Sequence, residues 1–153
     1  MKIFIVGLFP ETLSSALETS ILGRSVKNGS ITPVFIKLSD YSVRPTRRVD
    51  DRVYGGGSGT LLQCEPIALA LDEILENSAE KPEIFVMSPG GEMWMQASAQ
   101  EVANSGKDII ILCGHYEWID ERVIEYYNMR RISIGNYILT GGESAALIVI
   151  DSI

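Results

Sequence analysis

The chain has 153 residues, of which 46% are hydrophobic and 22% charged, and its formal net charge is −7. This length and apolar content suit one globular domain with a substantial core. The acidity argues against a nucleic-acid binder, because phosphate contacts depend on clustered lysines and arginines, and no DNA partner is expected. No run reaches the roughly 18 to 20 apolar residues of a membrane span, so no membrane partner is expected either.

The two cysteines, Cys64 and Cys113, lie far apart in sequence, and His115 is the only histidine. This pattern argues against a structural zinc site, no metal site is predicted, and reduced thiols fit a cytoplasmic protein. Pro10 and Glu11 break the first apolar run too early for a signal peptide. The low share of charged residues favours a buried subunit contact, so we expect a homodimer.

In chain order, five strand-like runs rich in isoleucine and valine alternate with stretches compatible with helices. The strands are expected at Lys2–Gly7, Ile31–Leu38, Glu83–Met87, Asp108–Cys113 and Arg130–Ile134, and the helices over residues 61–77, 93–104, 118–127 and 142–153. This alternation indicates an α/β layered fold with a mostly parallel sheet. The last helix carries no stop signal, so we expect it to continue beyond Ile153.

Residues 39–60 lack hydrophobic periodicity, which is typical of a functional or mobile loop. Guanidinium groups bind phosphate and aromatic rings stack on unpaired bases, so the arginines and tyrosine of this stretch favour contact with RNA. Ion pairing with the neighbouring Asp50 and Asp51 is the alternative. The glycines at 55–57 are interpreted as a hinge. The RNA-binding candidates are Arg44, Arg47, Arg48, Arg52, Tyr54, Gly55 and Gly56.

Bends of small residues follow three of the expected strands. They are MSPGGE at 87–92, CGHYEWIDER at 113–122 and SIGNYILTGGES at 133–144. Ligands of open α/β sheets bind outside the carboxyl ends of the strands, so three such bends on adjacent strands would line one pocket. The glycines of YGGGSGTLL at 54–62 follow no expected strand and lack the Lys-Ser/Thr of a phosphate loop, which excludes the common nucleotide-binding motifs.

The segment GHYEWIDER at 114–122 holds the densest group of polar residues. If a helix begins near Trp118, Glu117 lies at its N-terminal edge, where a carboxylate can cap amides or face a ligand. The charged residues at 120–122 are either part of this site or solvated helix charges. His115 is interpreted as a structural, hydrogen-bonded group, because no serine or cysteine stands in an obvious triad relation to it.

Six blocks together resemble the bacterial tRNA (guanine-N1)-methyltransferases of the TrmD family. They are LFPE at 8–11, SILGR at 20–24, RRVDDRVYGGGSG at 47–59, SPGG at 88–91, LCGHYEWIDERV at 112–123 and SIGNYILTGGESAALIVID at 133–151, in the family's order. The resemblance implies an α/β fold of the SPOUT class. Its C-terminal segment would form a deep trefoil knot around S-adenosylmethionine, a topology that general folding rules would discard.

The resemblance also implies the residues of the cofactor pocket and the partners. The pocket would comprise Ser88, Pro89, Gly90, Gly91, Gly114, Tyr116, Glu117, Ser133, Ile134, Gly135, Tyr137, Leu139, Gly141 and Gly142. The protein would be a homodimer whose active site forms across the subunit boundary, and its substrate would be tRNA.

The implied reaction is methylation of guanosine 37, next to the anticodon, at ring atom N1. This nitrogen must lose its proton, which requires a general base. In the family the base is an aspartate downstream of the knot, near a C-terminal tRNA-binding domain that would follow Ile153. Residues 1–153 are therefore expected to bind the cofactor but to methylate tRNA very slowly. Glu117 is a catalytic candidate only for orienting the guanine base of the substrate or a magnesium ion.

Two positions depart from the family pattern: Trp118 replaces a glycine and Asn136 an aspartate. These two differences leave the identity of the substrate less well defined than the fold. The alternatives are a non-catalytic module that binds S-adenosylmethionine or RNA, and a SPOUT methyltransferase with another RNA target.

Overall fold

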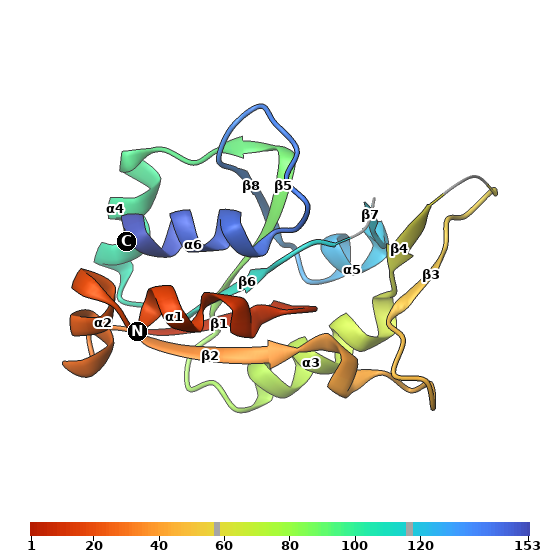
Figure 1. Ribbon diagram of the computed structural model, residues 1–153, viewed down its shortest axis with the longest axis horizontal. Helices are drawn as coiled ribbons and strands as arrows, with labels where there is room; N and C mark the ends of the chain where they lie inside the picture. Colours follow the sequence, from red (N-terminus) through yellow and green to blue (C-terminus); the bar gives the residue numbers. More distant parts are fainter. Residues whose placement is uncertain (57–58, 116–117) are drawn as a thin grey trace.

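Five parallel strands form the main sheet, in the order β2-β1-β6-β5-β8 (Figure 1). The computed structural model describes residues 1–56, 59–115 and 118–153, apart from the side chain of Trp118. The strands are β1 (Lys2–Gly7), β2 (Thr32–Lys37), β5 (Glu83–Met93), β6 (Ile109–Leu112) and β8 (Arg130–Ser133). All five expected strands are confirmed, and β5 extends six residues past its expected end at Met87.

Helices cover both faces of the sheet, and the side chains of each strand alternate between two cores. Ile110 and Leu112 of β6 point into the core formed with α3 (Cys64–Glu76) and α5 (Glu121–Tyr126). Ile109 and Ile111 point into the core formed with α1 (Ser14–Leu17), α4 (Gln96–Ser105) and α6 (Glu143–Ser152). Both cores bury continuous apolar strands, as expected for a sheet covered on two sides. No helix within the described residues is long and apolar enough to cross a membrane.

The segment between β1 and β2, for which the sequence gives no helix prediction, is helical. It contains a 3₁₀ turn, η1 (Pro10–Leu13), followed by α1 and α2 (Ser20–Lys27). These elements are short, so they present too few turns for a helical period to be recognised. The chain reverses tightly between the two helices: Ser20 has a φ of 56°, and a Cβ at Gly23 would lie 2.3 Å from the carbonyl oxygen of Glu18.

The aperiodic stretch 39–60 is not one long loop, which corrects the expectation from the sequence. It begins with η2 (Leu38–Tyr41) and supplies two strands of a small sheet with the order β3-β4-β7. These strands are β3 (Asp50–Arg52), β4 (Thr60–Leu62) and β7 (Trp118–Ile119). As a consequence, α3 begins at Cys64 and α5 at Glu121, three residues later than expected in each case. Strands of two or three residues are too short to show alternation in sequence.

Figure 1 shows the functional geography that results: both termini lie at one end of the molecule, and the β3–β4 hairpin projects at the other. The connection from β8 to α6 passes close to the ends of β5 and β6. It therefore joins the carboxyl edge of the sheet, where the three predicted bends meet.

Candidate functional site

Ser133 connects the first predicted bend, which lies inside β5 and not after it, to the bend that follows β8. Its buried side-chain Oγ lies 3.2 Å from the carbonyl oxygen of Pro89 and 3.0 Å from that of Gly135, and it accepts a 3.3 Å hydrogen bond from the Gly135 amide. The register of β5 against β8 shifts between Met87 and Glu92, so residues 88–91 bulge out of the strand. One hydroxyl therefore fixes the first bend to the third.

Gly142 connects the third bend to the second. Its amide donates a 2.8 Å hydrogen bond to the carbonyl oxygen of Gly114. A Cβ at Gly142 would lie 2.7 Å from the Gly114 nitrogen and 2.8 Å from the Cα of Cys113, so only glycine fits there. The same reasoning holds for Gly91, where a Cβ would lie 2.7 Å from the backbone of Arg131 and Ile132. At Gly142 the third bend therefore meets the second at backbone-to-backbone distance.

Glu143, the first residue of α6, is a buried carboxylate at this junction. Its Oε1 accepts a 3.4 Å hydrogen bond from the amide of Phe9, and its Oε2 lies 3.5 Å from Nδ1 of His115. The Phe9 and His115 rings pack edge to face, 5.7 Å apart. Glu143 thus ties the segment after β1 to the bend after β6. Sequence reasoning did not single out Glu143, although its place in GGES at a helix start was visible.

The third bend also carries apolar side chains toward solvent. Tyr137, Ile138 and Leu139 are 52%, 87% and 42% exposed. The Tyr137 ring folds back over Gly135, where a Cβ would lie 2.2 Å from it, and its hydroxyl donates a 3.4 Å hydrogen bond to the Ile134 carbonyl oxygen. Gly90, in the first bend, has open space where a Cβ would point. The edge therefore offers half-exposed apolar groups beside free backbone.

The predicted cofactor and catalytic residues divide into those on the three bends and those outside the described residues. Twelve of the predicted pocket residues lie on the three joined bends: Ser88, Pro89, Gly90, Gly91, Gly114, Ser133, Ile134, Gly135, Tyr137, Leu139, Gly141 and Gly142. Tyr116 and Glu117 lie outside the described residues. In the part of the chain that the structure describes, no three His, Cys, Asp or Glu side chains gather to hold a metal ion.

Cys113 lies under the same edge and is fully buried. Burial, reinforced by the charge of Glu143, raises the pKa of its thiol far above the usual value. The neutral thiol is a packing group and not a nucleophile.

Three of the predicted RNA-binding arginines form ion pairs within their own region. Arg44 pairs with Asp51 at 2.8 Å, Arg48 with Asp50 at 2.6 Å, and Arg47 with Asp40. The hydrogen bond from Arg48 holds the pKa of the buried Asp50 carboxyl below its usual value. The pairing that the sequence left as an alternative is thus present, and contact with RNA stays a prediction for these residues.

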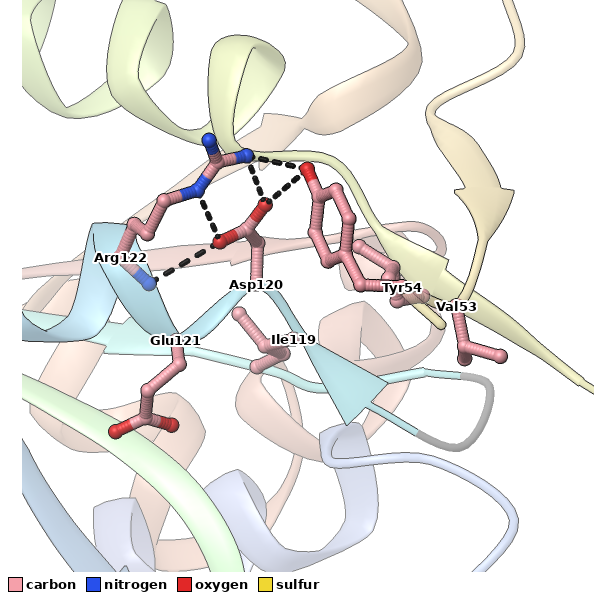
Figure 2. A pocket seen from close by; sticks show the side chains of 7 residues that line it. Val53, Tyr54, Ile119, Asp120, Glu121 and Arg122 are labelled. Atoms are coloured by element: carbon pink, nitrogen blue, oxygen red, sulfur yellow. Dashed lines mark hydrogen bonds and ion pairs between the residues drawn. The ribbon is translucent and has the colours of Figure 1, made fainter. Parts of the chain in front are cut away.

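Asp120, Arg122 and Tyr54 form a cluster beside a pocket of about 360 Å³ (Figure 2). The buried Asp120 carboxylate caps α5 by accepting from the Arg122 amide, and it accepts 3.0 and 2.7 Å bonds from the Arg122 guanidinium. Tyr54 places its hydroxyl 3.3 Å from Asp120 Oδ2 and within hydrogen-bond reach of Arg122. The hydrogen bonds from Arg122 lower the pKa of Asp120.

This cluster corrects one expectation and bears on an alternative that the sequence left open. The cap of α5 is Asp120 and not Glu117, because the helix begins at Glu121 and not near Trp118. Asp120 and Arg122 are also more than solvated helix charges. The signal that could have found the cap is an aspartate directly before a helical stretch.

The fold and this edge indicate a class: α/β domains with a candidate ligand site where glycine-rich bends meet at the carboxyl ends of parallel strands. A family model described as tRNA (Guanine-1)-methyltransferase TrmD matches residues 1–153. The chain belongs to this family.

Relatives and a solved structure agree with the family match. The tRNA (guanine-N(1)-)-methyltransferases of Ruminiclostridium cellulolyticum and Anoxybacillus flavithermus are each 40% identical to this chain over 153 residues. All of this chain is matched, and it spans 65% and 62% of their lengths. The crystal structure of tRNA (m1G37) methyltransferase from Aquifex aeolicus superimposes with a TM-score of 0.88 at 38% identity, covering 99% of this chain and 67% of that one.

Proposed function

We propose that the chain is the cofactor-binding part of an S-adenosylmethionine-dependent methyltransferase that modifies N1 of guanosine 37 in tRNA. Membership of the family and the similarity to an m1G37 methyltransferase support the reaction. The joined bends at the carboxyl edge support the place of the site. Because the substrate is tRNA and both cysteines are free, we propose that it acts in the cytoplasm.

The chemistry of the three bends fits such a cofactor. Open space at Gly90 admits a ligand close to the backbone, and the half-exposed Tyr137 and Leu139 can cover an adenine ring. Backbone amides and carbonyls of the first and third bends can bind the polar parts. The bound cofactor would supply a methyl group on a sulfonium centre. Tyr116 and Glu117, implied by the resemblance, complete the proposed set.

We propose further that the C-terminal segment forms a trefoil knot and that the protein is a homodimer. The contact of Gly142 with Gly114 supports the knot, since it brings the entry to α6 directly against the connection after β6. The strongly exposed Ile138, next to Tyr137 and Leu139, supports a subunit contact over the third bend.

The proposed reaction requires a general base, which residues 1–153 do not have to supply alone. Guanine N1 gains the methyl group, the sulfur keeps the electrons of the broken S–C bond, and the N1 proton passes to a general base. We propose that this base, and a tRNA-binding domain, follow Ile153 in the whole protein, as the resemblance implies. The chain's coverage of 65% and 62% of its relatives is consistent with this arrangement. The role left to Glu117 is to orient the guanine or a magnesium ion.

The observation that carries the proposal is the hydrogen-bonded union of three glycine-rich bends in a member of this family. Calorimetric titration of the 153-residue chain with S-adenosylmethionine should give saturable binding. Incubation of the chain with tRNA transcripts should give only slow methylation, and nucleoside mass analysis should find the product as 1-methylguanosine. Absence of binding by the folded chain, or methylation of another nucleoside, would refute the proposal.

A further inference from the structure

Tyr54 is the most exposed aromatic ring beside the pocket, yet it is held in place. The residue is 73% exposed, and its hydroxyl contacts both Asp120 and Arg122. An exposed tyrosine with no fixed partner would sample several rotamers. Figure 2 shows the hydroxyl directed at the carboxylate and the guanidinium, so the far end of the ring is anchored.

Arg122 also acts on the ring itself. Its guanidinium carbon lies 5.2 Å from the ring centroid, within the range of a cation–π contact. The guanidinium is in turn fixed by two hydrogen bonds to Asp120, whose carboxylate is buried at the start of α5. The cluster is therefore a chain of support: Asp120 orients Arg122, and both orient Tyr54.

The pocket beside the ring is suited to an aromatic ligand. Its lining includes the apolar side chains of Val53, Leu61 and Ile119, with Tyr54 at its edge. A cavity of about 360 Å³ admits one nucleobase. Proteins hold unpaired bases by stacking them on aromatic side chains, and the stack is favourable for every base.

We propose that Tyr54 is a stacking platform for one unpaired base of the RNA substrate and that Asp120 and Arg122 are positioning residues that preorganise it. The inference rests on the proposed function, because it takes the substrate to be an RNA loop. Preorganisation strengthens binding by removing the cost of ordering a side chain when the ligand arrives. Asp120 and Arg122, which also line the pocket, act in this proposal through Tyr54.

The test is a double-mutant cycle on RNA binding by the 153-residue chain. The probe is a hairpin RNA that reproduces an anticodon arm with guanosine 37, and a second set of hairpins has each loop nucleotide in turn made abasic. Tyr54→Leu should weaken binding about tenfold or more, the loss typical of one stacked base. Arg122→Gln and Tyr54→Phe should each weaken it about two- to tenfold, because the ring remains but is no longer fixed.

The decisive measurement is the effect of Arg122→Gln in the Tyr54→Leu background, which should be absent if Arg122 acts only through the ring. Arg122→Lys should not rescue, since a lysine keeps the charge but not the two-bond geometry. One abasic hairpin should bind wild type and Tyr54→Leu equally. Arg24→Gln, an exposed change on α2, is the matched control and should leave binding unchanged.

Three results would overturn the proposal: tight binding by Tyr54→Leu, an undiminished Arg122→Gln effect in the Tyr54→Leu background, or no hairpin binding by wild type. Titration of every variant with S-adenosylmethionine separates this outcome from failure of the proposed function. Variants that bind the cofactor normally are folded. A chain that binds the cofactor but not RNA would contradict the stacking role of Tyr54 and leave the proposed cofactor binding intact.

Discussion

The amide of Gly142 donates a 2.8 Å hydrogen bond to the carbonyl oxygen of Gly114, so the residue that precedes α6 rests directly on the connection that leaves β6. This contact needs glycine at position 142, because a Cβ there would lie 2.7 Å from the Gly114 nitrogen and 2.8 Å from the Cα of Cys113. Because backbone cannot move as a side chain can, the contact is intolerant of even one added methyl group.

Gly142→Ala should therefore destabilise the chain by about 1 to 3 kcal/mol, the usual cost of overpacking. Equilibrium urea unfolding measures the free energy, and calorimetry should show weaker binding of S-adenosylmethionine. Gly90→Ala is the matched comparison, since nothing lies within 4 Å of its Cβ position. Its unfolding free energy should stay within about 0.5 kcal/mol of wild type. Equal stability of the two variants would contradict the proposed close contact.

The Glu143 carboxylate predicts a second stability effect. Glu143→Ala removes a buried carboxylate that accepts a hydrogen bond from the Phe9 amide and lies 3.5 Å from His115 Nδ1, which should cost about 1 to 3 kcal/mol. Glu143→Gln keeps an oxygen acceptor of the same shape and should cost less than about half as much. Both values come from urea unfolding at neutral pH.

Glu125→Ala, an exposed change on α5, controls for loss of a glutamate as such and should have little effect. If Glu143→Ala proved as mild as Glu125→Ala, the carboxylate would not be what joins the segment after β1 to the bend after β6.

The sequence predicts the main sheet well because its strands are long, apolar and buried on both faces. The run Ile109–Leu112 is fully buried, and such a run has few other uses in a short chain. The small sheet is different. Leu61 and Leu62 pair with Trp118 and Ile119, and neither segment carries a sequence pattern that predicts this pairing.

The same distinction applies to the site. Glycine-rich stretches at the expected strand ends predict the three bends, and the resemblance to the family supplies the individual pocket residues. The bonds that join the bends link residues far apart in the chain, such as Ser133 to Pro89, and depend on a register shift in β5 that no local pattern encodes. Tyr54 and the charges at 120–122 were candidates from the sequence, but their contact with one another was not predicted, because it forms only when β4 and β7 pair.

The Arg48–Asp50 ion pair predicts a dependence of stability on acid pH. The hydrogen bond from Arg48 lowers the folded-state pKa of Asp50 below the unfolded value near 3.9. The pair therefore contributes stability above that unfolded value, and the contribution is lost as the pH falls through the folded pKa. Because the Arg48 side chain is 63% exposed, the contribution should not exceed about 1 kcal/mol.

Unfolding measured from pH 6 down to pH 3 should accordingly show a smaller loss of stability for Arg48→Gln than for wild type. Arg24→Gln removes an exposed arginine on α2 and should follow the wild-type curve. Parallel curves for wild type and Arg48→Gln would show that this pair does not couple folding to protonation.

The arginines of residues 44–52 should differ in their contribution to RNA binding. Arg47 is paired with Asp40, so contact with a phosphate requires that pair to break. Within the described part of the chain, the Arg52 guanidinium forms no ion pair, and the residue is exposed. Arg52→Gln should therefore weaken binding of an anticodon-arm hairpin more than Arg47→Gln. It should also reduce the slope of log affinity against log salt by about one. Fluorescence anisotropy at several salt concentrations measures both quantities, and an unchanged slope for Arg52→Gln would remove this residue from the RNA contact.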